Sequence, residues 1–115
     1  MHEYSIIAAL VDRVQREVEA RPGAVARKLR VRIGEQSGVE PDLLRTAFTT
    51  FRERSVCADA ELELVHAPAA WRCVGCDLPI ARGAALCCPS CGRPARLTSG
   101  DDIILERIEM EVPDV

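Results

Sequence analysis

Two cysteine pairs decide how this chain folds: Cys73-Val74-Gly75-Cys76 and, eleven residues further on, Cys88-Pro89-Ser90-Cys91. A gap of two residues lets both thiolates of a pair face one ion from a single tight turn, and two such pairs complete a closed tetrahedron. The spacing therefore predicts a structural zinc ion held by four thiolates. Gly92 follows the second pair, and we expect it to adopt the left-handed conformation that turns the chain away from the metal.

The segment 67–97 around these pairs is rich in Cys, Pro and Gly and has no helical period. A stretch of about 30 residues cannot bury enough apolar surface to fold unaided, so we expect zinc to hold it together as a ribbon lobe. Four thiolates around Zn²⁺ carry a net charge of about −2 and leave no coordination position open for Lewis-acid catalysis. Asp77 is the only acid of this segment, and four arginines can partly offset the charge of the site: Arg72, Arg82, Arg93 and Arg96.

The remaining cysteines are expected to stay outside the metal site. Cys87 could bind the ion only by displacing its neighbour Cys88, and Cys57 is interpreted as a small buried hydrophobic residue. A redox role would favour one isolated pair in a βαβ context, and disulfides would favour an oxidising compartment. The start of the chain has no basic segment followed by a long apolar run, and no stretch is long enough to span a membrane. We therefore expect a cytoplasmic protein whose cysteines bind metal.

Two stretches have the period of an amphipathic helix. The first runs from Tyr4 to Arg21 and ends before Pro22-Gly23, and the second begins at Pro41, whose missing N–H costs nothing in a first turn. Apolar residues recur at steps of three and four and should face the core: Tyr4, Ile7, Leu10, Val11, Val14 and Val18 in the first helix, and Leu44, Ala47, Phe48 and Phe51 in the second.

Three other stretches alternate as strands do. In the first, a basic face of Lys28, Arg30 and Arg32 alternates with a buried face of Leu29, Val31 and Ile33. In the second, Leu62 and Leu64 face inward beside Glu61 and Glu63. The third changes parity, which predicts a β-bulge near Glu106-Arg107, because its apolar residues are Ile103 and Leu105 and then Ile108, Met110 and Val112.

These patterns predict an α+β fold in which two helices pack on a three-stranded sheet, in the order α-β-α-β-[zinc ribbon]-β, with the four-cysteine zinc-ribbon lobe inserted before the last strand. We expect two lobes, one made of 1–66 and 98–115 and the other of 67–97. A chain of 115 residues suits one modest core. The net charge of −3 disfavours a general nucleic-acid binder, whose affinity would come from unopposed Lys and Arg.

The first residues, Met1-His2-Glu3, offer three nitrogen donors in one short stretch. The α-amine of Met1 and the amide of His2 close a five-membered chelate ring, and that amide and the imidazole close a six-membered one. Ni(II) and Cu(II) accept such a planar set, whereas Zn(II) prefers a tetrahedron. The fourth position is left to Glu3 or to a partner. The pattern alone is also that of a solvent-exposed histidine near a helix start, and His66 is interpreted as a surface residue because it lacks a paired ligand.

Several segments together resemble the hydrogenase nickel-incorporation proteins, small metallochaperones that help to load nickel into nickel-iron hydrogenases and, in some organisms, urease. The resemblance covers nearly the whole chain, in order: Met-His-Glu-Tyr-Ser at 1–5, the segment 33–48 with Gly-Glu-Gln-Ser-Gly at 34–38, Ala-Glu-Leu-Glu-Leu at 60–64, the two cysteine pairs, and Ser-Gly-Asp-Asp-Ile at 99–103.

The resemblance implies nickel at Met1, His2 and Glu3, structural zinc at Cys73, Cys76, Cys88 and Cys91, and an α+β nickel lobe that carries the ribbon. The chain departs from the family pattern at Asp77, where a glycine would follow the first cysteine pair, so this turn is expected to be less tightly specified. Cys57 and Cys87 are additional cysteines.

The expected function is that of a nickel metallochaperone, not an enzyme, which binds Ni(II) at its N-terminus and delivers it during maturation of nickel-iron hydrogenase or of urease. The implied partners are a nickel-handling GTPase, the hydrogenase large subunit and urease maturation proteins, without nucleic acid or membrane, for a monomer or weak homodimer. The basic strand face at 28–32 is a candidate contact for the GTPase. The alternative is a zinc-ribbon interaction or regulatory module with no nickel role.

Overall fold

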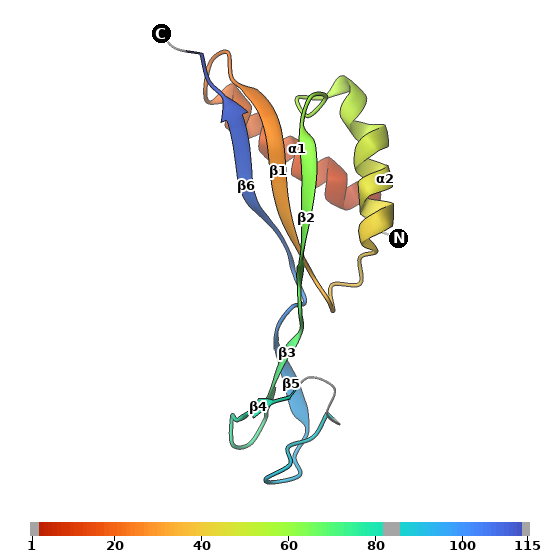
Figure 1. The fold of residues 1–115 in the computed structure, drawn as a ribbon, viewed down its shortest axis with the longest axis vertical. Coiled ribbons are helices and arrows are strands. Elements are labelled where there is room, and N and C mark those ends of the chain that lie inside the picture. The colour runs from red at the N-terminus through yellow and green to blue at the C-terminus, as the bar shows by residue number, and fades with distance from the viewer. Residues whose placement is uncertain (1–2, 82–85, 114–115) are drawn as a thin grey trace. The chain divides into compact units, whose positions relative to one another are not determined.

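The structure, a computed structural model, describes residues 3–81 and 86–113. Its elements, drawn in Figure 1, are α1 (Glu3–Glu19), β1 (Val25–Gly34), α2 (Pro41–Phe51), the 3₁₀ turn η1 (Arg52–Arg54), β2 (Glu61–Ala67), β3 (Ala70–Cys73), β4 (Pro79–Ile80), β5 (Ala95–Ser99) and β6 (Ile103–Glu111). One sheet has the order β2-β1-β6 and a second has the order β4-β3-β5. The predicted α+β order is confirmed, and the inserted segment contains a small sheet of its own.

The chain forms two compact units. The first contains the residues up to Arg32, Val39–Val65 and the residues from Ile104 onward, and the second contains Ile33–Gly38 and His66–Ile103. The second unit thus includes the turn that follows β1. The division into lobes 1–66 with 98–115 and 67–97 stays a prediction about which segments fold together.

In the first unit, α1 runs across one face of the β2-β1-β6 sheet and packs against α2 (Figure 1). The core is made of aliphatic residues and one aromatic residue, as the small number of aromatics in the chain requires: Ile7, Leu10, Val11 and Val14 from α1, Leu29 and Val31 from β1, Leu44, Ala47 and Phe48 from α2, and Leu62 from β2.

Two predicted core positions of the helices are wrong, and so is Val112 of the last strand, which is 54% exposed and follows the end of β6. Tyr4 is 56% exposed, because it lies at one border of the α1 stripe while the neighbouring Glu3 takes the more central, buried position. Phe51 is 42% exposed, because it is the last residue of α2, where the chain already turns into η1. Helical periodicity identifies the stripe correctly but overestimates how far the packing extends along each helix.

The face of the sheet that carries the basic residues of β1 is an ion-pair ladder. Lys28 Nζ lies 3.1 Å from Glu63, Arg30 Nε lies 3.4 Å from Glu63 and 3.5 Å from Glu106, and Arg32 lies 3.7 Å from Glu106. The pKa of the Glu63 carboxyl is lowered mainly by Lys28 and more weakly by Arg30 and Arg107. Glu106 of β6 completes this ladder. The β-bulge near Glu106-Arg107 stays a prediction.

Three segments of the second unit are joined by backbone hydrogen bonds. The Gly34 N–H donates to Asp102 at 2.8 Å, Glu35 N–H to Ala67 at 2.8 Å, and Gln36 N–H to Gly100 at 2.7 Å. The Glu35 carboxylate also accepts the N–H of Ala69 at 2.8 Å. A Cβ on Gly34 would collide with the carbonyl group of Gly100, so this close approach requires glycine.

Candidate metal centre

The first knuckle, residues 73–78, begins where β3 ends. The backbone N–H groups of Gly75 and Cys76 donate to Cys73 Sγ at 3.3 and 3.4 Å. The turn is closed by Asp77 N–H, which donates to the Cys73 carbonyl at 3.2 Å, and by Cys73 N–H, which donates to the Leu78 carbonyl at 2.9 Å. These bonds point the Cys73 and Cys76 side chains to one side of the turn.

The second knuckle, residues 88–93, repeats this arrangement. Gly92 N–H donates to the Cys88 carbonyl at 2.8 Å, and Cys88 N–H donates to the Arg93 carbonyl at 2.8 Å. Gly92 has a φ of 75°, so the predicted left-handed turn is confirmed. Residues whose numbers differ by fifteen are thus equivalent in the two knuckles. The cysteine spacing in the sequence is sufficient to predict this local geometry.

The two knuckles bring four sulfur atoms together. Cys73 and Cys91 lie 3.3 Å apart, Cys76 and Cys88 3.5 Å, and Cys76 and Cys91 3.9 Å, with all four within 4.8 Å of one another. A Zn–S bond of about 2.3 Å places the sulfurs of a regular tetrahedron about 3.8 Å apart, so the cluster fits a zinc ion. Cys73 and Cys88 are buried against Ile80 with Trp71 and Ala95, while Cys76 and Cys91 are exposed.

The thiols of the cluster ionise unequally. The backbone N–H of Cys76, followed by that of Gly75, lowers the pKa of the Cys73 thiol to about 6. The N–H groups of Cys91 and Ser90 likewise lower the pKa of Cys88. The sulfurs of Cys73 and Cys88 raise the pKa of Cys76 to about 12, because a second negative charge beside a thiolate is unfavourable. A bound cation removes this repulsion, so the arrangement favours a metal ion.

Asp77 occupies the position at which the family pattern has glycine, and it has a φ of 57°. The expectation of a loosely specified turn is wrong, because the Asp77 carboxylate accepts hydrogen bonds from Arg72 Nε at 3.2 Å and from Arg96 Nη2 at 2.7 Å. Arg72 lies on β3 and Arg96 on β5, so these bonds connect the first knuckle to both strands. The spacing of the cysteines gave no signal for this contact.

None of the other described candidate residues belongs to the cluster. Cys57 is fully buried, and burial raises the pKa of its thiol, as expected for a structural cysteine. Cys87 is exposed and is not among the clustered sulfurs, and His66 is an exposed residue of β2. Met1 and His2 lie outside the described residues. Glu3 is the first residue of α1, and only 7% of it is exposed.

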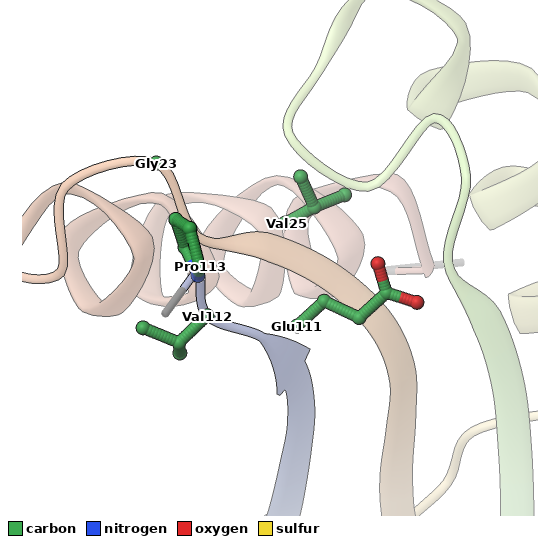
Figure 2. A pocket seen from close by; sticks show the side chains of 5 residues that line it. All are labelled: Gly23, Val25, Glu111, Val112 and Pro113. Atoms are coloured by element: carbon green, nitrogen blue, oxygen red, sulfur yellow. The ribbon is translucent and has the colours of Figure 1, made fainter. Parts of the chain in front are cut away.

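A hollow of about 320 Å³ lies at the end of the first unit's sheet where β1 begins and β6 ends (Figure 2). It is lined by Gly23, Val25, Glu111, Val112 and Pro113. Among these described lining residues the one carboxylate, that of Glu111, pairs with Arg27 at 3.0 Å. Among the helices of the described residues, none has the length and apolar character needed to cross a bilayer.

Comparison with known proteins identifies the family. The family model for hydrogenase/urease nickel incorporation, metallochaperone, HypA, matches residues 1–110. The chain is 35% identical to the hydrogenase maturation factor HypA of Shewanella sp. strain MR-7, over 99% of this chain and 98% of the relative. It is 37% identical to the factor of the same name from Wolinella succinogenes, over 99% of this chain and 98% of the relative.

Solved structures give the same result. The solution structure of the Ni metallochaperone HypA from Helicobacter pylori superposes with a TM-score of 0.73 at 30% identity, over 98% of this chain and 100% of the other. Another solution structure of a HypA protein has a TM-score of 0.79 at 30% identity, over 98% of each chain. The full-length match, the four-cysteine cluster and the α+β fold agree, and the chain belongs to the HypA family of nickel metallochaperones for hydrogenase maturation.

Proposed function

We propose that this chain carries Ni(II) at its N-terminus, bound by the α-amine of Met1, the amide and imidazole of His2, and Glu3. The observation that carries the proposal is the family match, which begins at residue 1 and so includes the Met-His-Glu start. Glu3 supports it, because it is the first residue of α1 and directly follows Met1 and His2 in the sequence. In a polypeptide that begins at Met1, these donors form two fused chelate rings around a planar Ni(II) ion.

The same donors explain how the ion is released. Protons compete with nickel for the imidazole, whose ordinary pKa is about 6.5, and for the amine, whose ordinary pKa is about 8. Binding therefore weakens as the pH falls through this range.

Cys73, Cys76, Cys88 and Cys91 hold a structural zinc ion in this proposal. Its support is the fit of the four sulfur atoms to a tetrahedron and the backbone N–H groups that stabilise the thiolates. When bound, zinc supplies a cross-link between the two knuckles. Four thiolates leave no position for a substrate, so this zinc ion takes no part in Lewis-acid catalysis. The role proposed for the chain is that of a carrier and not of an enzyme.

The partners of this proposal are a nickel-handling GTPase, the hydrogenase large subunit and, where urease is present, its maturation proteins. The chain works in the cytoplasm as a monomer or weak homodimer, where clustered thiols stay reduced. The basic residues Lys28, Arg30 and Arg32 make a poor docking patch for the GTPase, because Glu63 and Glu106 already pair with them. Charge reversal of these residues should therefore leave the association rate with the GTPase almost unchanged at low salt.

The two histidines of the chain provide a matched test of the nickel site. His2→Ala removes the imidazole and should abolish stoichiometric Ni(II) binding by titration calorimetry, whereas His66→Ala should bind as wild type does. Glu3→Gln should weaken binding by less than His2→Ala. Each protein is first checked by intact mass for a free Met1 amine. If His2→Ala binds nickel normally and restores hydrogenase activity in a deletion strain, the nickel site is elsewhere and the zinc-module alternative gains support.

A further inference from the structure

Arg93 is the last residue of the second knuckle and also contacts the first knuckle. Its carbonyl accepts the N–H of Cys88 at 2.8 Å, and its own N–H donates to Cys91 Sγ. Its side chain extends to the first knuckle, because a Cβ added to Gly75 would lie 2.6 Å from both Cδ and Nη1 of Arg93. The guanidinium therefore rests on the backbone of Gly75, whose N–H donates to Cys73 Sγ at 3.3 Å.

Among the described arginines of the segment 67–97, Arg93 differs in its ion pairing. Arg72 and Arg96 both pair with Asp77. Asp77 is the only acid of the segment 67–97, and within the described part of the chain Arg93 has no carboxylate partner. The backbone N–H of Arg93 instead donates to one sulfur of the cluster, that of Cys91, and its guanidinium lies against Gly75, whose N–H donates to Cys73 Sγ. Four thiolates around Zn²⁺ carry a net charge of about −2. Arg93 is therefore placed to serve as the counter-charge of the site.

The glycine of the first knuckle fits this arrangement. The φ of Gly75 lies outside the left-handed region, so the backbone itself accepts a Cβ at this position. The equivalent residue of the second knuckle is Ser90, which carries a side chain in the same kind of turn. A side chain at position 75 would displace the guanidinium of Arg93. Gly75 therefore leaves the space in which the Arg93 side chain reaches the first knuckle.

We infer that Arg93 is a clasp over the four-thiolate centre, which lowers the reactivity of the thiolates and slows the loss of zinc. A guanidinium beside a thiolate stabilises its negative charge and covers one approach to the sulfur. Gly75 acts only by making room for it. This inference rests on the zinc site proposed above.

The test is the rate at which the zinc-loaded chain releases its ion when a neutral electrophile, N-ethylmaleimide, attacks the thiolates. A chromogenic chelator in excess records the released zinc, so alkylation of Cys57 or Cys87 does not enter the signal. Arg93→Gln should release zinc about two- to fivefold faster, the range for a partly exposed charge interaction. Gly75→Ala should accelerate zinc release to a similar extent, although it retains the charge of Arg93. The double variant, Gly75→Ala with Arg93→Gln, should release zinc at the same rate as Arg93→Gln alone. The rate for Arg93→Lys should lie between those of Arg93→Gln and wild type.

Arg72→Gln is the charge-matched control, since it removes one cation that is already paired with Asp77. An equal rate for Arg93→Gln and wild type overturns the clasp. Equal acceleration by Arg72→Gln also overturns it, because net charge would then explain the effect. Further acceleration when Gly75→Ala is added to Arg93→Gln means that Gly75 acts through its own backbone, which contradicts the inference. Native mass spectrometry of wild type comes first, and a wild-type chain without zinc refutes the proposed zinc site itself.

Discussion

The two knuckles have the same hydrogen bonds but reach the same turn with different residues. At the equivalent positions 77 and 92 the backbone is left-handed, with φ values of 57° and 75°. Gly92 adopts this conformation without a steric cost, whereas Asp77 does so at a cost of about 1–2 kcal/mol, reduced because aspartate tolerates the region better than most residues. Asp77 gains two arginine partners in exchange. The turn is thus required in both knuckles, and it is stabilised by conformation in one and by side-chain contacts in the other.

The largest effect is expected when a zinc ligand is removed, because both knuckles then lose their structure. Cys73→Ser or Cys88→Ser should lose zinc and unfold the segment 67–97, because zinc binding worth about 10–16 kcal/mol is mostly the folding free energy of such a lobe. The helices and the β2-β1-β6 sheet should stay folded, since their core lies outside that segment. Native mass spectrometry measures the zinc, and amide hydrogen exchange locates the unfolding. Full zinc content in Cys88→Ser would make Cys87 a ligand.

A substitution at position 92 tests the knuckle that relies on conformation. Gly92→Ala should destabilise the zinc-loaded lobe by about 1–2 kcal/mol, because alanine is strained at this φ. Nothing lies within 4 Å of the added Cβ, so steric contact contributes nothing to the loss. The measurement is the chelator concentration at which half of the zinc is lost. An unchanged value would mean that the second turn can relax to an ordinary φ.

The same measurement on Asp77 tests the knuckle that relies on contacts. Asp77→Gly relieves the strain but removes two exposed ion pairs worth about 0–1 kcal/mol each, so its net effect should be within about 0.5 kcal/mol of zero. Asp77→Ala keeps the strain and loses the contacts, and should cost about 1–2 kcal/mol. The difference between the two variants isolates the conformational part. If glycine and alanine behave alike at position 77, the turn is not strained.

The smallest expected effect concerns the two cysteines that belong to neither knuckle. Cys57→Ala and Cys87→Ala should each keep one zinc per chain and normal nickel binding, because neither sulfur is in the four-cysteine cluster. Native mass spectrometry with added nickel counts both metals. Cys57→Ala should still lower thermal stability slightly, since its side chain is fully buried. Loss of zinc from either variant would contradict the ligand set.

The sequence predicted the parts of the molecule that depend on local spacing. The gap of two residues in each cysteine pair, the left-handed Gly92 and the helical stripes are all properties of a few neighbouring residues. The missed features depend on residues far apart in the chain, such as Lys28 with Glu63, Arg30 with Glu106, and Arg96 with Asp77. Arg93 and Gly75 belong to the same class, because only the folded lobe brings one knuckle onto the other.

The pairing of β3 with β5 also shortens a loop on which the larger sheet depends. Strand β6 follows β2 only after residues 68–102, yet both are strands of the β2-β1-β6 sheet. Once the zinc-held lobe has formed, the pairing of Ala70 with Ser99 brings the two ends of this connecting segment together. The effective loop then shrinks by nearly three doublings, and each doubling costs about 0.6 kcal/mol of closure entropy. Zinc thereby contributes on the order of 2 kcal/mol to a sheet that contains none of its ligands.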